Sequence, residues 1–114
     1  MPQEPAPYAP LDVAGTASWL IESLALFAGH RVEAIIPVAH GAAVAGIRER
    51  KLAIAPLDYE WPIPVDVLAA YRSQRDAFAV TGSPAFSGGL NIGSQLHYLE
   101  AQAPELFREA TLLP

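Results

Sequence analysis

A histidine and a glycine interrupt an apolar stretch in the first half of the chain. Residues 35–47 read IIPVAHGAAVAGI, so His40 and Gly41 fall at the exit of a run typical of a buried strand. An imidazole in this position can hydrogen-bond to a ligand, and a glycine lets the ligand approach the backbone closely. A core histidine satisfied by a backbone carbonyl produces the same pattern. The sequence leaves both roles open for His40.

Two carboxylates and two aromatic rings alternate in the segment Asp58-Tyr59-Glu60-Trp61. If the backbone is extended there, side chains two residues apart point the same way, which places Asp58 and Glu60 on one face. Carboxylates accept hydrogen bonds from hydroxyl groups, so the segment predicts a sugar contact. The alternative is a solvated acidic loop whose aromatic rings are packed down as anchors. A metal site built from His40, Asp58 and Glu60 has no ligand spacing in its favour.

Composition limits the classes of protein to consider. The 114 residues, 52% of them hydrophobic, suffice for one domain with a core. A net charge of -5 and only 7 Lys and Arg disfavour nucleic-acid binding, which needs a basic surface. The chain has no cysteine for disulfides or thiolate metal sites, and no apolar run of about 18 residues that would span a membrane. We expect a cytoplasmic protein that acts on a small molecule, without a nucleic-acid or membrane partner.

The elements that would position these residues begin with a proline-rich arm, residues 1–11, which we expect to carry no core. A helix is predicted from Asp12, its N-cap, to a stop at Gly29, because apolar residues recur between them at helical spacing. Residues 32–38 are almost wholly apolar, which predicts a buried strand.

The rest of the chain predicts a hairpin, an ordered loop, two helices and a short closing strand. The hairpin comprises residues 43–47 and 52–55, and the loop comprises residues 56–64. One helix is predicted over residues 65–79, and a second helix is capped by Asn91 and interrupted at Pro104. The last strand is predicted at residues 110–114. This order predicts an α/β fold. We expect the strand at 32–38 and the hairpin to share one sheet, covered by the helices that begin at Asp12 and Asn91.

Taken in order, the motifs IIPVAHGAAVAGI, PLDYEW, TGSP, GLNIGSQLHYLEAQAPELF and ATLLP resemble the FGGY family of carbohydrate kinases. The resemblance covers most of residues 12–114 and depends on the order of the motifs rather than on any single one. It implies a partial ribonuclease-H-like domain of the actin/hexokinase type, with a mixed sheet, a hairpin and flanking helices. Members of the family bind a sugar and ATP with Mg²⁺ between two such domains, and an aspartate base helps a sugar hydroxyl attack the γ-phosphate.

The resemblance assigns the sugar side of such a kinase to this chain. His40 and Gly41 match the family's sugar-contacting loop. The segment from Asp58 to Glu60 matches its Trp-x-Asp loop, with the difference that Asp58 and Glu60 stand in place of Trp and Asp. Gln95 stands where the family often has a lysine. The pattern is closer to kinases of ketoses or deoxyketoses, such as rhamnulose or fuculose, than to glycerol kinases.

Three parts of such a kinase have no counterpart in the 114 residues: the phosphate loop, the catalytic aspartate and the nucleotide domain. We therefore expect residues 12–114 to be a partial sugar-binding N-terminal domain that works with the remainder of a kinase chain. Alone it would be inactive and would need neither ATP nor Mg²⁺. Two other interpretations stay open: a stand-alone sugar-binding or regulatory module, and a structural interaction domain that forms oligomers through an exposed sheet edge.

Overall fold

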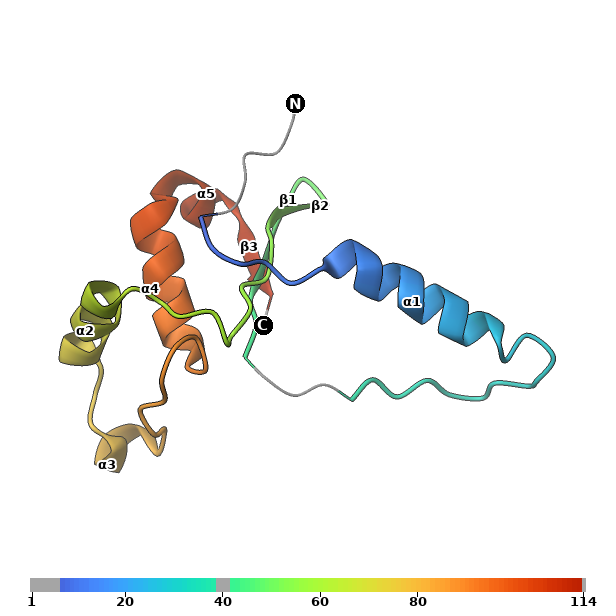
Figure 1. Cartoon of the computed structure of the whole chain (residues 1–114), viewed down its shortest axis with the longest axis horizontal. Helices are drawn as coiled ribbons and strands as arrows, with labels where there is room; N and C mark the ends of the chain where they lie inside the picture. Colours follow the sequence, from blue (N-terminus) through green and yellow to red (C-terminus); the bar gives the residue numbers. More distant parts are fainter. Residues whose placement is uncertain (1–6, 39–41, 114) are drawn as a thin grey trace.

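The computed structural model describes residues 7–38 and 42–113 of the chain (Figure 1). Its helices and strands are, in order, α1 (Val13–Ala25), β1 (Ala45–Arg48), β2 (Lys51–Ile54), α2 (Val65–Gln74), α3 (Phe78–Thr81), α4 (Ile92–Gln102), α5 (Pro104–Glu109) and β3 (Thr111–Leu113). This is a small α/β fold. Helix α1 and the segment that follows it project away from the other elements (Figure 1).

Strand β1 is the centre of a three-stranded antiparallel sheet with the order β2-β1-β3. Strands β1 and β2 form the predicted hairpin, and the two residues between them have positive φ, 51° at Glu49 and 62° at Arg50. Positive φ at both positions is what a two-residue type I′ turn requires. Strand β3 pairs with β1 from Ala45 opposite Leu113 to Ile47 opposite Thr111, which confirms the closing strand.

Residues 32–38 form no strand, which corrects the prediction made from their apolar sequence. They lie outside every helix and strand, and Ile36 and Val38 are 81% and 92% exposed. The physical reason is the pairing of β1. A strand needs a hydrogen-bonded neighbour, and β1, the neighbour expected for residues 32–38, is already paired on both sides by β2 and β3.

Helix α1 begins as predicted but does not cover the sheet. The Asp12 carboxylate caps it by accepting a hydrogen bond from the backbone nitrogen of Gly15 over 2.8 Å. The helix ends at Ala25, and Gly29 does not take a positive φ, so the predicted left-handed stop is wrong. No residue of α1 is buried. Helix α4, by contrast, shares the core with Ile54 of β2, as expected.

The core lies between helix α4, the loop after β2 and the proline-rich arm. Its buried residues are Tyr8, Ile54, Leu57, Ile63, Tyr98 and Leu99. The Tyr8 hydroxyl donates a hydrogen bond to the carbonyl of Ala55, and the backbone nitrogen of Leu11 donates to Pro56 over 2.8 Å. The prediction that the arm carries no core is therefore wrong for its described residues. Prolines exclude regular structure there, but they leave the Tyr8 ring free to be buried.

The predicted helix over 65–79 is divided in two. Helix α2 ends at Gln74, where Arg75 takes an extended backbone conformation, and the Arg75 side chain donates a hydrogen bond to the carbonyl of Ser83 over 2.7 Å. Helix α3 follows and ends at Gly82, which has a φ of 65°. None of the helices in the described ranges is long and apolar enough to cross a membrane.

Candidate functional site

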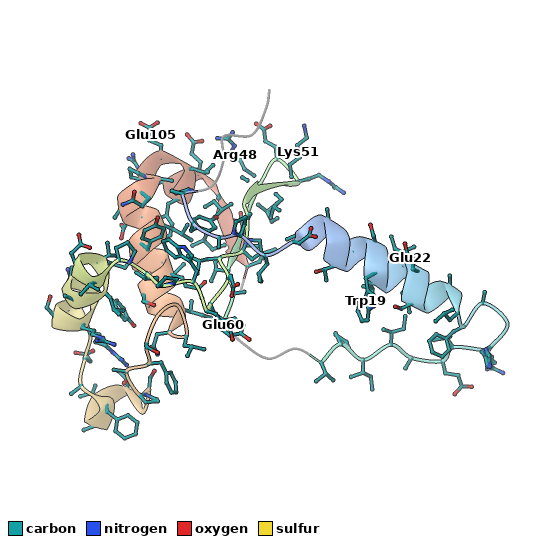
Figure 2. All side chains as sticks on the ribbon, viewed as in Figure 1. Trp19, Glu22, Arg48, Lys51, Glu60 and Glu105 are labelled. Atoms are coloured by element: carbon teal, nitrogen blue, oxygen red, sulfur yellow. The ribbon has the colours of Figure 1, made fainter. Side chains whose placement is uncertain are left out.

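The segment from Asp58 to Trp61 is a turn rather than an extended strand. The Asp58 carboxylate accepts a hydrogen bond from the backbone nitrogen of Glu60 over 2.9 Å, and the Asp58 carbonyl accepts one from Trp61 over 2.9 Å. The expectation of two carboxylates on one extended face is therefore wrong, because the Asp58 side chain closes the turn. Glu60 is exposed on the loop that follows β2 (Figure 2).

Trp61 anchors this turn to the core. Its ring centroid lies 5.2 Å from that of Tyr98 and 6.4 Å from that of Tyr8. Burial raises the pKa of both tyrosines, and the neighbouring Tyr98 raises the pKa of Tyr8 further. Trp61 therefore fits the alternative interpretation of this segment, a solvated acidic loop whose aromatic rings are packed down as anchors. Tyr59 and Trp61 are both partly exposed.

Gly88 and Gly89 form a second turn that lies against the first. The backbone nitrogen of Gly89 donates to the carbonyl of Tyr59 over 3.2 Å. A Cβ atom on Gly89 would lie 3.1 Å from the Leu57 side chain and 3.2 Å from the Tyr59 Cα atom, so a larger residue would force these neighbours to move by a few tenths of an ångström. Gly88 has a φ of 57°, which also favours glycine.

Gln95 joins this pair of turns to the segment that begins at Ala42. Its side chain is fully buried, and its Nε2 atom donates to the carbonyls of Ala42, over 2.7 Å, and Gly89, over 2.6 Å. Its Oε1 atom is buried without a hydrogen-bond partner. Sequence analysis singled out Gln95 only as a replacement for a lysine. Its position four residues before Leu99, on the buried face of α4, was the available signal.

The start of α4 is also fixed differently from the prediction. Asn91 is the N-cap residue by position, but its side chain accepts from the backbone nitrogen of Phe86 and donates to Pro84 instead of bonding to the helix. The buried Ser94 hydroxyl lies 3.1 Å from the carbonyl oxygen of Gly88 and 2.7 Å from that of Asn91. Ser94 and Gln95 together hold the glycine turn on the end of α4.

The structure therefore describes some of the predicted site residues and not others. His40 and Gly41 lie outside the described residues. Asp58 and Glu60 lie in one turn, in which Asp58 is part of the backbone hydrogen bonding and Glu60 presents a free-standing carboxylate to solvent. Among residues 7–38 and 42–113, no group of three or more His, Cys, Asp or Glu side chains could hold a metal ion. The chemistry that the turn offers is hydrogen-bond acceptance by a carboxylate.

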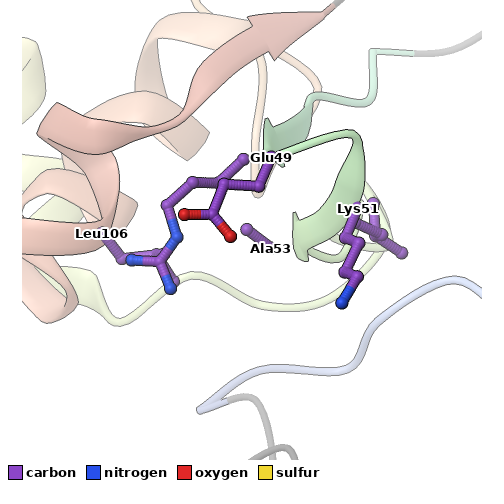
Figure 3. Close-up of a pocket in the computed structure, with 6 residues that line it drawn as sticks. Glu49, Lys51, Ala53 and Leu106 are labelled. Carbon is purple, nitrogen blue, oxygen red and sulfur yellow. The ribbon is translucent and has the colours of Figure 1, made fainter.

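An open pocket of about 370 Å³ lies beside the β1–β2 hairpin (Figure 3). It is lined by Arg48, Glu49, Lys51, Leu52, Ala53 and Leu106. Arg48 also pairs with Glu109 of α5 over 2.6 Å. Neither Asp58 nor Glu60 lines this pocket, so it is separate from the turn that carries them.

Comparison with known proteins finds one solved structure of a carbohydrate kinase that resembles the chain. No model of a protein family matches it, and no curated protein does. Among solved structures, it matches a carbohydrate kinase from Novosphingobium aromaticivorans with a TM-score of 0.88 and 50% sequence identity over 100% of the chain. The chain spans 25% of the length of that kinase. The expected likeness to part of a carbohydrate kinase is confirmed, whereas the FGGY assignment stays a prediction.

Proposed function

We propose that this chain supplies the sugar-side part of an ATP-dependent carbohydrate kinase of the FGGY type. The observation that carries the proposal is the match to a carbohydrate kinase at 50% identity and a TM-score of 0.88 over the whole chain. The motif order from IIPVAHGAAVAGI to ATLLP supports the FGGY assignment. A kinase of this kind works on a soluble sugar, which fits the proposed cytoplasmic location.

In this proposal the turn after β2 contacts the sugar. Glu60 accepts a hydrogen bond from a sugar hydroxyl through its exposed carboxylate. Asp58 fixes the turn through its bond to the Glu60 backbone, and His40 with Gly41 forms the second contact, as the family resemblance implies. Gln95 holds the segment from Ala42 against the glycine turn, which in turn supports Tyr59.

ATP and Mg²⁺ do not fit the described residues of this chain. The glycine turn is followed by Ser94 and Gln95 rather than by the Lys-Ser/Thr pair of a phosphate-binding loop, and its Gly88 and Gly89 carbonyls are used by those two side chains. We therefore assign the nucleotide and its metal to the rest of the kinase chain.

The test is a chimera in which this chain replaces the matching quarter of the Novosphingobium kinase. We expect the chimera to release ADP only when a sugar substrate of that kinase is present, because this chain carries the same fold with half of the same residues. The unaltered kinase is the positive control. A chimera that folds, as judged by a cooperative thermal transition, and yet shows no sugar-dependent ADP release rejects the proposed function.

A further inference from the structure

The β1–β2 hairpin concentrates positive charge in an acidic chain. Arg48, Arg50 and Lys51 are three of the seven Lys and Arg residues of the chain, whose net charge is -5. The carboxylates beside them are Glu49, in the turn, and Glu109, which pairs with Arg48. Three cations against two carboxylates leave the hairpin with one net positive charge. The hairpin therefore attracts anions, although the chain as a whole repels them.

Arg48 and Lys51 lie on the same face of the hairpin. They are directly opposite each other in the register of β1 and β2, and opposite side chains of an antiparallel pair share one face, with Cβ atoms about 5 Å apart. Two like charges in this position destabilise the strand pair. Glu109 offsets the charge of Arg48 through a hydrogen bond from Nη1 over 2.6 Å. Lys51 forms no ion pair within the part of the chain that the structure describes.

Arg48 retains donors for a second anion. A guanidinium carries five N–H donors, and the described contact with Glu109 engages only the Nη1 atom. The Arg48 side chain is 49% exposed in spite of this pairing, so a ligand can reach it. Glu109 thus fixes the guanidinium in place and leaves part of it open beside Lys51.

The turn between these two cations is strained. Glu49 and Arg50 have φ angles of 51° and 62°, which asparagine and glycine adopt at lower cost. Both residues are exposed, so burial of their side chains does not offset this cost. Backbone strain of this kind clusters at ligand-binding sites. The strain and the like-charge pair occur together at the tip of the hairpin, beside the pocket.

The pocket of about 370 Å³ has room for more than an inorganic ion, because pockets for small molecules measure about 300–1,000 Å³. Ala53 of β2 and Leu106 of α5 supply apolar surface, and Arg48, Glu49 and Lys51 supply polar groups (Figure 3). The Glu49 carboxylate repels an anionic group but accepts hydrogen bonds from hydroxyl groups. The pocket therefore suits a ligand with one strongly anionic end and a carbon skeleton that bears hydroxyl groups.

We propose that the hairpin pocket binds a small phosphate monoester, with the phosphate between Arg48 and Lys51 and the hydroxyl-bearing skeleton beside Glu49 and Leu106. A phosphate monoester carries a charge of about -1.5 to -2 near pH 7, which matches two cations, whereas a carboxylate matches one. Arginine binds phosphate through two parallel hydrogen bonds, and lysine binds it as a point charge. Sugar phosphates belong to this class. The inference does not rest on the proposed function, because the pocket is separate from the turn that carries Glu60.

The experiment titrates the ¹⁵N-labelled 114-residue chain with glucose 6-phosphate, inorganic phosphate and glucose, each followed by NMR at an ionic strength of about 0.02 M, where surface charges are little screened. Glucose 6-phosphate should shift the amide signals of residues 48–53 and of Leu106 saturably. Its Kd should be at least fivefold lower than that of inorganic phosphate, and glucose should cause no shift. Arg48→Gln and Lys51→Gln should each raise the Kd for glucose 6-phosphate at least tenfold, whereas Lys51→Arg should change it less than threefold.

The matched control is Arg31→Gln, which removes an exposed cation that also pairs with a carboxylate, Glu33, over 3.5 Å. It should leave the Kd unchanged. Glu49→Ala should strengthen the binding of inorganic phosphate and reduce the preference for glucose 6-phosphate, because it removes both the repulsion and the acceptor. If Arg48→Gln alters signals across the whole spectrum, its fold is perturbed and Lys51→Gln decides.

Three results overturn the proposal. The first is the absence of saturable shifts at residues 48–53 with glucose 6-phosphate. The second is equal affinity for glucose 6-phosphate and inorganic phosphate, which would leave charge alone as the cause of binding and reject a phosphate monoester as the ligand. The third is equal weakening by Arg31→Gln and Lys51→Gln, which would show a general attraction of anions to exposed cations.

Discussion

The Nε2 atom of Gln95 lies 2.6 Å from the carbonyl oxygen of Gly89, and this buried hydrogen bond joins helix α4 to the turn that supports Tyr59. The same nitrogen donates to Ala42, so one side chain connects three segments distant in the sequence. Because both acceptors are backbone carbonyls, the amide nitrogen must face them. The carbonyl half of the amide is left buried without a partner.

Replacing Gln95 with Leu should lower the free energy of unfolding by about 2–4 kcal/mol, because the buried carbonyl of Gly89 and the partly buried carbonyl of Ala42 lose their donor. Gln95→Glu should cost more at neutral pH, since it places a carboxylate oxygen against the carbonyls of Ala42 and Gly89. Urea denaturation measures both changes. Gln102→Leu on the exposed side of α4 is the control and should change stability by less than about 0.5 kcal/mol. Equal effects at positions 95 and 102 would contradict the role of the buried amide.

The two glycines of the turn should respond to alanine for different reasons. Gly88→Ala should cost about 1 kcal/mol, because an L side chain is strained at a φ of 57°. Gly89→Ala should cost about 1–3 kcal/mol, because the new Cβ would press on Leu57 and on the Tyr59 backbone. Gly29→Ala, with nothing within 4 Å and no positive φ, serves as the control and should be neutral or slightly stabilising. Thermal or urea unfolding distinguishes the three; a loss of stability at position 29 as large as at position 89 would argue against a close approach.

The hairpin could be predicted from the sequence because its information is local. A charged turn separates two short apolar runs, and β1 and β2 pair across it. Residues 32–38 carry an equally clear strand pattern, but a strand also needs a neighbour, and its neighbour cannot be read from its own composition. The edge of β1 that these residues would use is taken by β3, which comes from the far end of the chain. The strand prediction for residues 32–38 was therefore wrong about the pairing of the segment, whereas their local preference for an extended backbone was not contradicted.

The site could be predicted only in part for a similar reason. The sequence located the acidic and aromatic turn, but not that Asp58 folds back to bond to the Glu60 backbone. Proline content predicted the absence of regular structure in the arm, yet it says nothing about burial, and Tyr8 enters the core. Gln95 was classed by comparison with a family pattern, whereas its importance comes from two carbonyls 6 and 53 residues away.

The β1–β2 turn offers a stabilising substitution. Glu49 and Arg50 both have positive φ, which costs energy in residues with a Cβ and suits Asn-Gly in a type I′ turn. The double change Glu49→Asn and Arg50→Gly should raise the free energy of unfolding by about 1 kcal/mol. Arg31→Gly is a control at an exposed position without positive φ and should not stabilise. If the double variant is no more stable than the parent in urea, the turn is not of this type.

The buried tyrosines predict how stability changes at high pH. Burial raises the pKa of Tyr8 and Tyr98 above the ordinary value of 10.0, so the folded state favours the neutral hydroxyls. Their contribution is complete below pH 10 and is lost as the pH rises above 10 toward the raised folded values. Urea midpoints between pH 8 and 11 measure the decline. Tyr8→Phe should lower the midpoint at pH 8, by loss of its bond to Ala55, and should make the decline shallower. An unchanged slope in Tyr8→Phe would show that other groups cause it.

The last prediction concerns the sugar contact itself and uses the chimera with the Novosphingobium kinase. If the exposed carboxylate of Glu60 accepts a sugar hydroxyl, Glu60→Gln should raise the KM for sugar about tenfold, the loss of one charge-assisted hydrogen bond, and should leave the KM for ATP unchanged. His40→Ala should also raise the sugar KM, by about fivefold for a neutral imidazole. Glu100→Gln, at an exposed position on α4, is the control for a change of charge. If Glu60→Gln behaves like Glu100→Gln in an otherwise active chimera, the turn after β2 is a solvated loop, and the sugar must be held by other residues.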